Sequence, residues 1–219
     1  MFYGAAEFSR DTDFAILADA ANLERLDAAL RELQASVIAV PPLALTFLQR
    51  GHAVHFRCQH PEAAGLRVDV MSKMRGVAEF AELWARRTRL QGADGTIYEL
   101  MSLPDLVQAK KTQRDKDWPM IRRLIEADRI ACRGTPSLEQ VRFWLLEART
   151  PELLLELARQ FPLEATAVAN GSRPLLTAVL QGDEAAIEAG LFEEERIERA
   201  ADRAYWIPLK QELERMRHS

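Results

Sequence analysis

The chain has 219 residues, of which 48% are hydrophobic and 28% are charged, and its formal net charge is −4. This length is enough to bury one large core or two small ones, and the composition is that of a globular protein. The negative balance argues against a surface that binds nucleic acid broadly through its phosphates, and it leaves room only for a local basic patch.

The cysteines and the apolar runs predict a cytoplasmic protein without membrane contact. Cys58 and Cys132 belong to no Cys-x-x-Cys pair, so neither a disulfide framework nor a zinc knuckle is indicated. No apolar run reaches the roughly 18 residues that span a bilayer, and the N-terminus lacks the basic-then-apolar pattern of a secretory signal.

Strand and helix patterns alternate through the first hundred residues. Short apolar or alternating runs predict strands at 14–17, 53–57, 66–71 and 96–101. Apolar residues spaced by three and four predict helices at 22–33, 43–50 and 77–87. Asn22 is the expected cap of the first helix, and Gly51 is placed to end the second. Residues 1–102 are therefore expected to form a mixed sheet with helices.

Helical periodicity dominates after Ser102, which we expect to cap a helix that has Pro104 in its first turn. Helices are predicted at 104–113, 116–130, 137–147, 151–160, 174–180, 183–190 and 194–216. The predicted fold class is thus α+β, with a mixed-sheet domain over 1–102 and an α-helical domain over 103–219.

Three carboxylates stand out as candidate metal ligands. Asp11 and Asp13 are two positions apart, so on a strand both point to the same side. Asp69 lies in the predicted strand 66–71 between two valines. Together these acids could bind one or two Mg²⁺ ions, which prefer oxygen ligands and bridge to phosphates. The alternative is that the acids cap turns or face solvent.

The sequence resembles the bacterial minimal nucleotidyltransferases, a group that includes relatives of the abortive-infection (AbiEii-type) toxins. Three blocks carry the resemblance, in the family's order and rough spacing: Phe8-Ser-Arg-Asp-Thr-Asp-Phe14, Arg67-Val-Asp-Val-Met71, and the segment 103–117, which reads LPDLVQAKKTQRDKD. The resemblance covers roughly residues 4–130 and implies a nucleotidyltransferase-like sheet in the first domain.

The resemblance also implies roles for individual residues. It assigns metal binding and catalysis to Asp11, Asp13 and Asp69, and nucleotide contact to Lys110, with Arg114 beside it. Ser9 is expected to cap a turn or to touch phosphate. Because Lys110, Arg114 and Asp117 are spaced by four and three, one helical face could carry all three, provided that the turn before Trp118 does not break the helix. The alternative for this basic cluster is a solvated face with internal ion pairs.

The implied activity is a Mg²⁺-dependent transfer of a nucleoside monophosphate from a nucleoside triphosphate to an RNA or protein acceptor, of toxin–antitoxin type. A homodimer or an antitoxin is the expected partner. The family's Gly-Gly or Gly-Ser loop, which holds the nucleotide phosphates, would precede this chain, so we expect either a start codon assigned too far downstream or a truncated form. The alternative is a catalytically impaired protein that keeps the fold and acts as a binding or assembly module.

One further cluster combines histidine and cysteine, the usual ligands of zinc. His52, His55, Cys58 and His60 lie within nine residues. On a strand these side chains alternate between faces, and no second ligand pair accompanies them, so we do not expect a zinc site.

Overall fold

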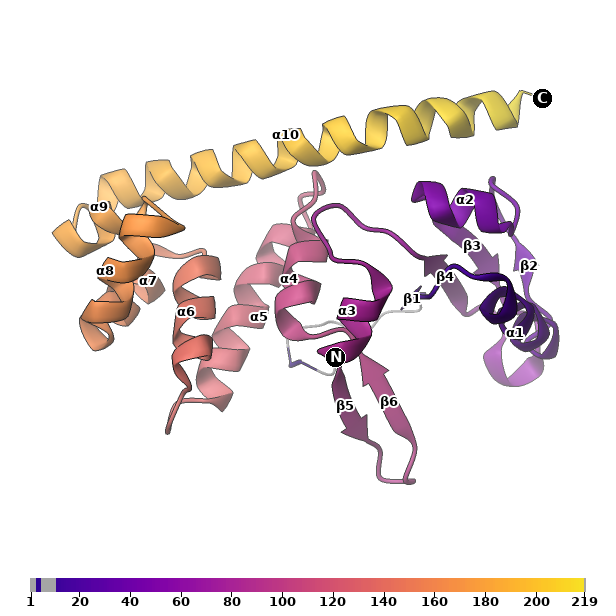
Figure 1. Cartoon of the computed structure of the whole chain (residues 1–219), viewed down its shortest axis with the longest axis horizontal. Coiled ribbons are helices and arrows are strands. Elements are labelled where there is room, and N and C mark those ends of the chain that lie inside the picture. Colours follow the sequence, from indigo (N-terminus) through magenta and orange to yellow (C-terminus); the bar gives the residue numbers. More distant parts are fainter. Residues whose placement is uncertain (1–2, 5–10, 219) are drawn as a thin grey trace. The chain divides into compact units, whose positions relative to one another are not determined.

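The computed structural model describes residues 3–4 and 11–218 (Figure 1), and its fold class is α+β, as the sequence predicts. Two compact units divide the chain. The α/β unit comprises Phe8–Ala109 and Ala204–Ser219, and the helical unit comprises Met1–Glu7 and Lys110–Arg203. The last part of the chain therefore belongs to the same unit as the sheet, which sequence periodicity does not indicate.

A four-stranded mixed sheet forms the centre of the α/β unit. Its strands are β1 (Asp11–Ala15), β2 (Ser36–Val37), β3 (Val54–Arg57) and β4 (Arg67–Met71), in the order β1-β4-β3-β2. β1 runs parallel to β4, whereas β3 is antiparallel to both β4 and β2. The sequence predicts the first strand at 14–17, but the strand begins at Asp11, because backbone pairing with β4 tolerates polar side chains on an exposed strand.

One face of the sheet packs on α1 (Ala20–Glu32) and α2 (Leu45–Arg50). The shared core consists of Leu30, Leu48, Val54, Phe56, Cys58, Val68 and Val70. α1 begins earlier than predicted, because the side chain of Asp19 rather than that of Asn22 caps it, accepting the backbone N–H of Asn22. α2 ends at Gly51, whose φ of 102° is the left-handed conformation expected of this glycine.

The α/β unit also contains a short 3₁₀ turn between β3 and β4. After β4 come a helix, a hairpin and a further helix, whose last residue, Lys110, belongs to the helical unit. These elements are η1 (Pro61–Ala63), α3 (Phe80–Ala85), β5 (Thr88–Gln91), β6 (Ile97–Leu100) and α4 (Leu103–Lys110). β5 is absent from the predicted elements because it carries little apolar alternation; it pairs with β6 and sets Arg89 opposite Glu99. Ser102 accepts the backbone N–H of Asp105 at the start of α4, as predicted.

The helical unit contains α5 (Asp117–Ala131), α6 (Leu138–Glu147), α7 (Pro151–Gln160), α8 (Pro162–Gly171), α9 (Leu176–Gln181) and the first part of α10 (Glu184–Arg217). Its fully buried side chains include Ile121, Ile125, Trp144, Leu145, Leu154, Leu157, Leu176 and Ile187. The sequence pattern does not predict α8, because the small apolar residues of this helix are distributed around its axis and do not form one apolar face.

α10 corrects the prediction of two separate helices at 183–190 and 194–216. Gly190 does not break the helix but allows a close approach, since a Cβ there would lie 2.3 Å from Cδ1 of Leu175. Pro208 is accommodated inside the same helix. Within residues 3–4 and 11–218, no helix has both the length and the apolar content needed to cross a membrane.

Candidate functional site

The register of β1 on β4 brings the three predicted acids onto one face of the sheet. Asp11 pairs with Arg67 and Asp13 pairs with Asp69 across the parallel strands. Paired residues of neighbouring strands point to the same side, as do residues i and i+2 of one strand. Asp11, Asp13 and Asp69 therefore share the face opposite the α1/α2 core, and we call these three residues the acidic face.

The three acids differ in exposure because their strands occupy different places in the sheet. β1 lies at one edge, and Asp11 and Asp13 are exposed. β4 lies between β1 and β3, and only 8% of Asp69 is exposed. A buried carboxylate needs hydrogen-bond donors or a counter-charge, and Asp69 has both.

Arg67 and His55 hold the carboxylate of Asp69. Nε of Arg67 donates to Oδ1 of Asp69 at 2.8 Å, and Nη2 donates to Oδ2 at 2.9 Å, so the contact is bidentate. His55, which pairs with Asp69 across β3 and β4, places Nδ1 2.8 Å from the same Oδ1 and 3.2 Å from Nη2 of Arg67.

All three carboxylates of the acidic face affect the pKa of Arg67. Its pKa is raised above the usual value, first by the hydrogen bond to Asp69 and then by the negative charges of Asp69, Asp11 and Asp13, while partial burial acts in the opposite direction. Arg67 is thus the counter-charge of all three acids and not of Asp69 alone.

The donor set of the acidic face suits Mg²⁺ in kind, because all three groups are carboxylates on one face of two adjacent strands. Among the described residues, however, no group of three His, Cys, Asp or Glu side chains converges as a metal site would require. The carboxylate of Asp69 is engaged by Arg67 and His55.

Three residues were predicted to contact nucleotide, namely Ser9, Lys110 and Arg114. Ser9 falls outside the described residues. Lys110 ends α4, and Arg114 lies in the turn before α5; both belong to the helical unit. The prediction that Lys110, Arg114 and Asp117 share one helical face is wrong, because the helix stops at Lys110. Thr112 and Arg114 instead donate to Oδ2 of the buried Asp117, at 2.5 and 2.7 Å.

Sequence reasoning missed Arg67 and His55 as members of the site. Arg67 was detectable, because residues 67 and 69 of a strand share one face and opposite charges on that face attract. His55 was not, because its contact with Asp69 depends on the register of β3 on β4. The other three discounted residues have different surroundings: Cys58 is in the α1/α2 core, His52 contacts Glu212 of α10 through Nε2 at 2.8 Å, and His60 caps η1 by accepting the backbone N–H of Glu62.

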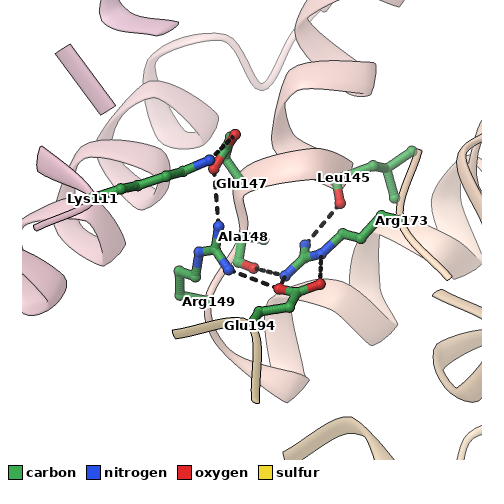
Figure 2. A network of polar contacts seen from close by, with 7 residues as sticks. All are labelled: Lys111, Leu145, Glu147, Ala148, Arg149, Arg173 and Glu194. Carbon is green, nitrogen blue, oxygen red and sulfur yellow. Dashed lines mark hydrogen bonds and ion pairs between the residues drawn. The ribbon is translucent and has the colours of Figure 1, made fainter. Parts of the chain in front are cut away.

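A second charged cluster lies in the helical unit (Figure 2), where Lys111 and Arg173 are buried and the other members are partly buried. We call it the Arg173 network; it consists of Lys111, Glu147, Arg149, Arg173 and Glu194. Arg173 donates to both carboxylate oxygens of Glu194, at 2.9 and 2.7 Å. Its guanidinium also donates to the carbonyls of Leu145 and Ala148 at 2.9 and 3.0 Å, which caps the C-terminal end of α6.

Arg149 and Lys111 connect the remaining members of the Arg173 network. Arg149 joins the two glutamates by donating to Glu194 at 2.8 Å and to Glu147 at 3.1 Å. Lys111 donates to the other oxygen of Glu147 at 2.8 Å. Because both carboxylates are fully engaged by cations of the chain itself, the network is a structural support and not a ligand site.

The chain was compared with protein families and with curated proteins. No protein-family model matches the chain, and no curated protein matches its sequence.

Proposed function

We propose that the protein is a nucleotidyltransferase whose acidic face binds the divalent cation that accompanies a nucleoside triphosphate. The observation that carries the proposal is the in-register pairing of Asp13 with Asp69, with Asp11 beside them on the same face of two parallel strands. The resemblance of the segments 8–14, 67–71 and 103–117 to minimal nucleotidyltransferases points to the same chemistry.

The proposed reaction joins the α-phosphorus of the triphosphate to an acceptor hydroxyl of RNA or protein. The bond between the α-phosphorus and the bridging oxygen breaks, pyrophosphate leaves, and the hydroxyl gives up its proton. A bound Mg²⁺ would offset the charge of the phosphates and of the attacking oxygen. Asp11 and Asp13 present exposed oxygens for the cation, whereas the buried Asp69 is the candidate acceptor of the hydroxyl proton.

The test measures the transfer of label from each of four α-labelled nucleoside triphosphates to total RNA and to protein, with Mg²⁺ or Mn²⁺ present. We expect transfer by the full chain and a loss of at least a hundredfold in Asp13→Ala and Asp69→Ala, because positioning and charge supply most of the rate in such reactions. Glu24→Gln, which alters an exposed acid on α1, is the matched control and should keep full activity. An Asp69→Ala protein as active as the parent would overturn the proposal.

One observation favours a second candidate function. Arg67 already neutralises Asp69, so the sheet can be stable and complete as a binding or assembly module that turns over no nucleotide. Calorimetry separates the two candidates. Mg²⁺-dependent binding of a triphosphate that is lost in Asp13→Ala supports the transferase, whereas the absence of such binding supports the module.

A further inference from the structure

The last part of α10 belongs to the α/β unit and docks on the end of α2. α10 enters this unit at Ala204, and of residues 204–217, all of which the structure describes, only Leu209 is buried. Tyr205, Leu209 and Glu212 are spaced by four and three, so they lie on one face of the helix. We call residues 204–217 the strap.

This face of the strap contacts three consecutive residues, Arg50, Gly51 and His52. Gly51 ends α2 with a φ of 102°, and a Cβ there would lie 2.8 Å from Oη of Tyr205 and 3.9 Å from Cδ1 of Leu209. A side chain at this position would therefore displace Tyr205, and the absence of one in glycine permits the close approach.

Glu212 holds the strap through its carboxylate. Oε1 accepts a hydrogen bond from Nη1 of Arg50, and Oε2 lies 2.8 Å from Nε2 of His52. His52 is only 1% exposed, and its Nδ1 is buried without a hydrogen-bond partner, so the hydrogen bonding of this ring depends on Glu212. Because an ionised carboxylate only accepts, Nε2 donates in the neutral and in the charged imidazole alike. Protonation of Glu212 therefore removes the negative charge that both contacts use.

The pKa of Glu212 agrees with this geometry. It is lowered first by the hydrogen bond with His52 and then by the hydrogen bond and the charge of Arg50, while partial burial acts in the opposite direction. The ionised carboxylate thus stabilises docking above the ordinary pKa of a free glutamate, about 4.3, and this contribution is lost as the pH falls through the pKa of the docked state.

Two further charged residues lie near the docking site. Lys73 follows β4, and a Cβ at Gly51 would lie 3.8 Å from its Cβ; its Nζ is 3.9 Å from Oε1 of Glu79. Arg215 lies three positions after Glu212 and is exposed. Lysine and arginine ordinarily keep their charge throughout the acid range, so the acid dependence of docking comes from the carboxylate.

The strap also has a weak turn at its beginning. Pro208 has no N–H to donate to the carbonyl of Ala204, so one helical hydrogen bond is absent where α10 enters the α/β unit. We propose that the strap is an acid-released switch, which Glu212 holds on α2 and which opens about the turn 204–208 when this carboxylate is protonated. Opening leaves Arg50 and His52 without their carboxylate partner.

Hydrogen exchange followed by mass spectrometry measures the opening of the strap in the full chain. Peptides from 204–217 report the strap, and peptides from α1 report the rest of the α/β unit. At pH 7, Glu212→Gln should raise the opening constant of the strap about fivefold and leave α1 unchanged, because charged hydrogen bonds become neutral ones. Glu214→Gln alters an exposed acid of the same helix and should change the constant by less than about twofold.

Acid should abolish the difference between the wild type and Glu212→Gln. After correction for the intrinsic effect of pH on exchange, the opening of the wild-type strap should rise between pH 7 and pH 3 until it equals that of the variant, whose glutamine does not titrate. A difference that is as large at pH 3 as at pH 7 would refute release by protonation.

A charge reversal tests the contact without acid. At pH 7, Arg50→Glu should raise the opening constant about tenfold, because two carboxylates then face each other, and Arg50→Glu/Glu212→Arg should recover most of the loss, because the pair re-forms in the opposite direction. A double variant that is as open as Arg50→Glu would show that this contact does not hold the strap. If Glu212→Gln raises exchange in α1 as much as in the strap, the strap does not open separately, and the inference is refuted as well.

Discussion

The acidic face and the Arg173 network are both built from arginine and carboxylate side chains, but the two clusters differ in burial and in the number of cations for each acid. In the Arg173 network, the guanidinium of Arg173 is buried and donates to both oxygens of Glu194 and to two carbonyls of α6. On the acidic face, a single arginine serves three acids, two of which are exposed. The Arg173 network supports the fold, because every carboxylate oxygen in it accepts from a cation of the chain, whereas the exposed acids of the acidic face are the ones proposed to bind a cation.

The sharpest test of this contrast is the removal of Arg173. Arg173→Met keeps the length of the stem but removes the donors at the end of α6 and leaves Glu194 with Arg149 alone, so we expect the free energy of unfolding to fall by about 3–5 kcal/mol. Urea denaturation followed by circular dichroism measures this. Arg196→Met is the control, since Arg196 makes a similar two-bonded pair with Glu193 at exposed positions, and should cost at most about 1 kcal/mol. Equal losses in the two variants would refute the structural role of the network.

Glu194 gives the network a pH dependence. Burial raises its pKa, but the hydrogen bond from Arg173 and the charges of Arg173 and Arg149 outweigh burial, so the pKa lies below its usual value. A lowered folded-state pKa means that the carboxylate contributes stability above the unfolded pKa of about 4.3. That contribution disappears as the pH falls through the folded-state pKa.

Glu194→Gln isolates this effect. We expect the variant to lose about 2 kcal/mol of stability at pH 7, because charged hydrogen bonds become neutral ones. The difference from the wild type should shrink as urea midpoints are measured from pH 7 down to pH 3, since protonation removes the same charge from the wild type. A difference that stays constant over this range would show that Glu194 acts through packing and not through its charge.

The smallest expected effect has the opposite sign and belongs to the acidic face. Asp13 lies directly beside Asp69 on the neighbouring strand, and like charges in this position are destabilising. Asp13→Asn should therefore raise the free energy of unfolding by about 0.5 kcal/mol in metal-free buffer while it weakens Mn²⁺ binding. Glu24→Gln should change neither quantity. A loss of more than 1 kcal/mol in Asp13→Asn would show that this acid supports the fold, as the acids of the Arg173 network do.

The sequence pattern within single segments predicted several strands and helix ends. The alternation of valines with polar residues in 66–71 predicts β4, and it places Asp69 on the face opposite the core. Ser102 begins α4 and Gly51 ends α2, because each satisfies backbone groups that a helix end leaves open. Other boundaries were not predicted. α10 continues through Gly190, and the close packing of this glycine on Leu175 explains why a residue without a side chain is found there.

The sequence by itself determined the α+β class, the strand that carries Asp69, and the shared face of Asp11 and Asp13, because these depend on periodicities of two and 3.6 residues within one segment. Only the tertiary structure decided that Asp13 lies beside Asp69, that His55 reaches the same carboxylate, and that Arg173 holds Glu194. These contacts join residues that are distant in the chain. They follow from strand register and helix packing, which local patterns constrain but do not specify.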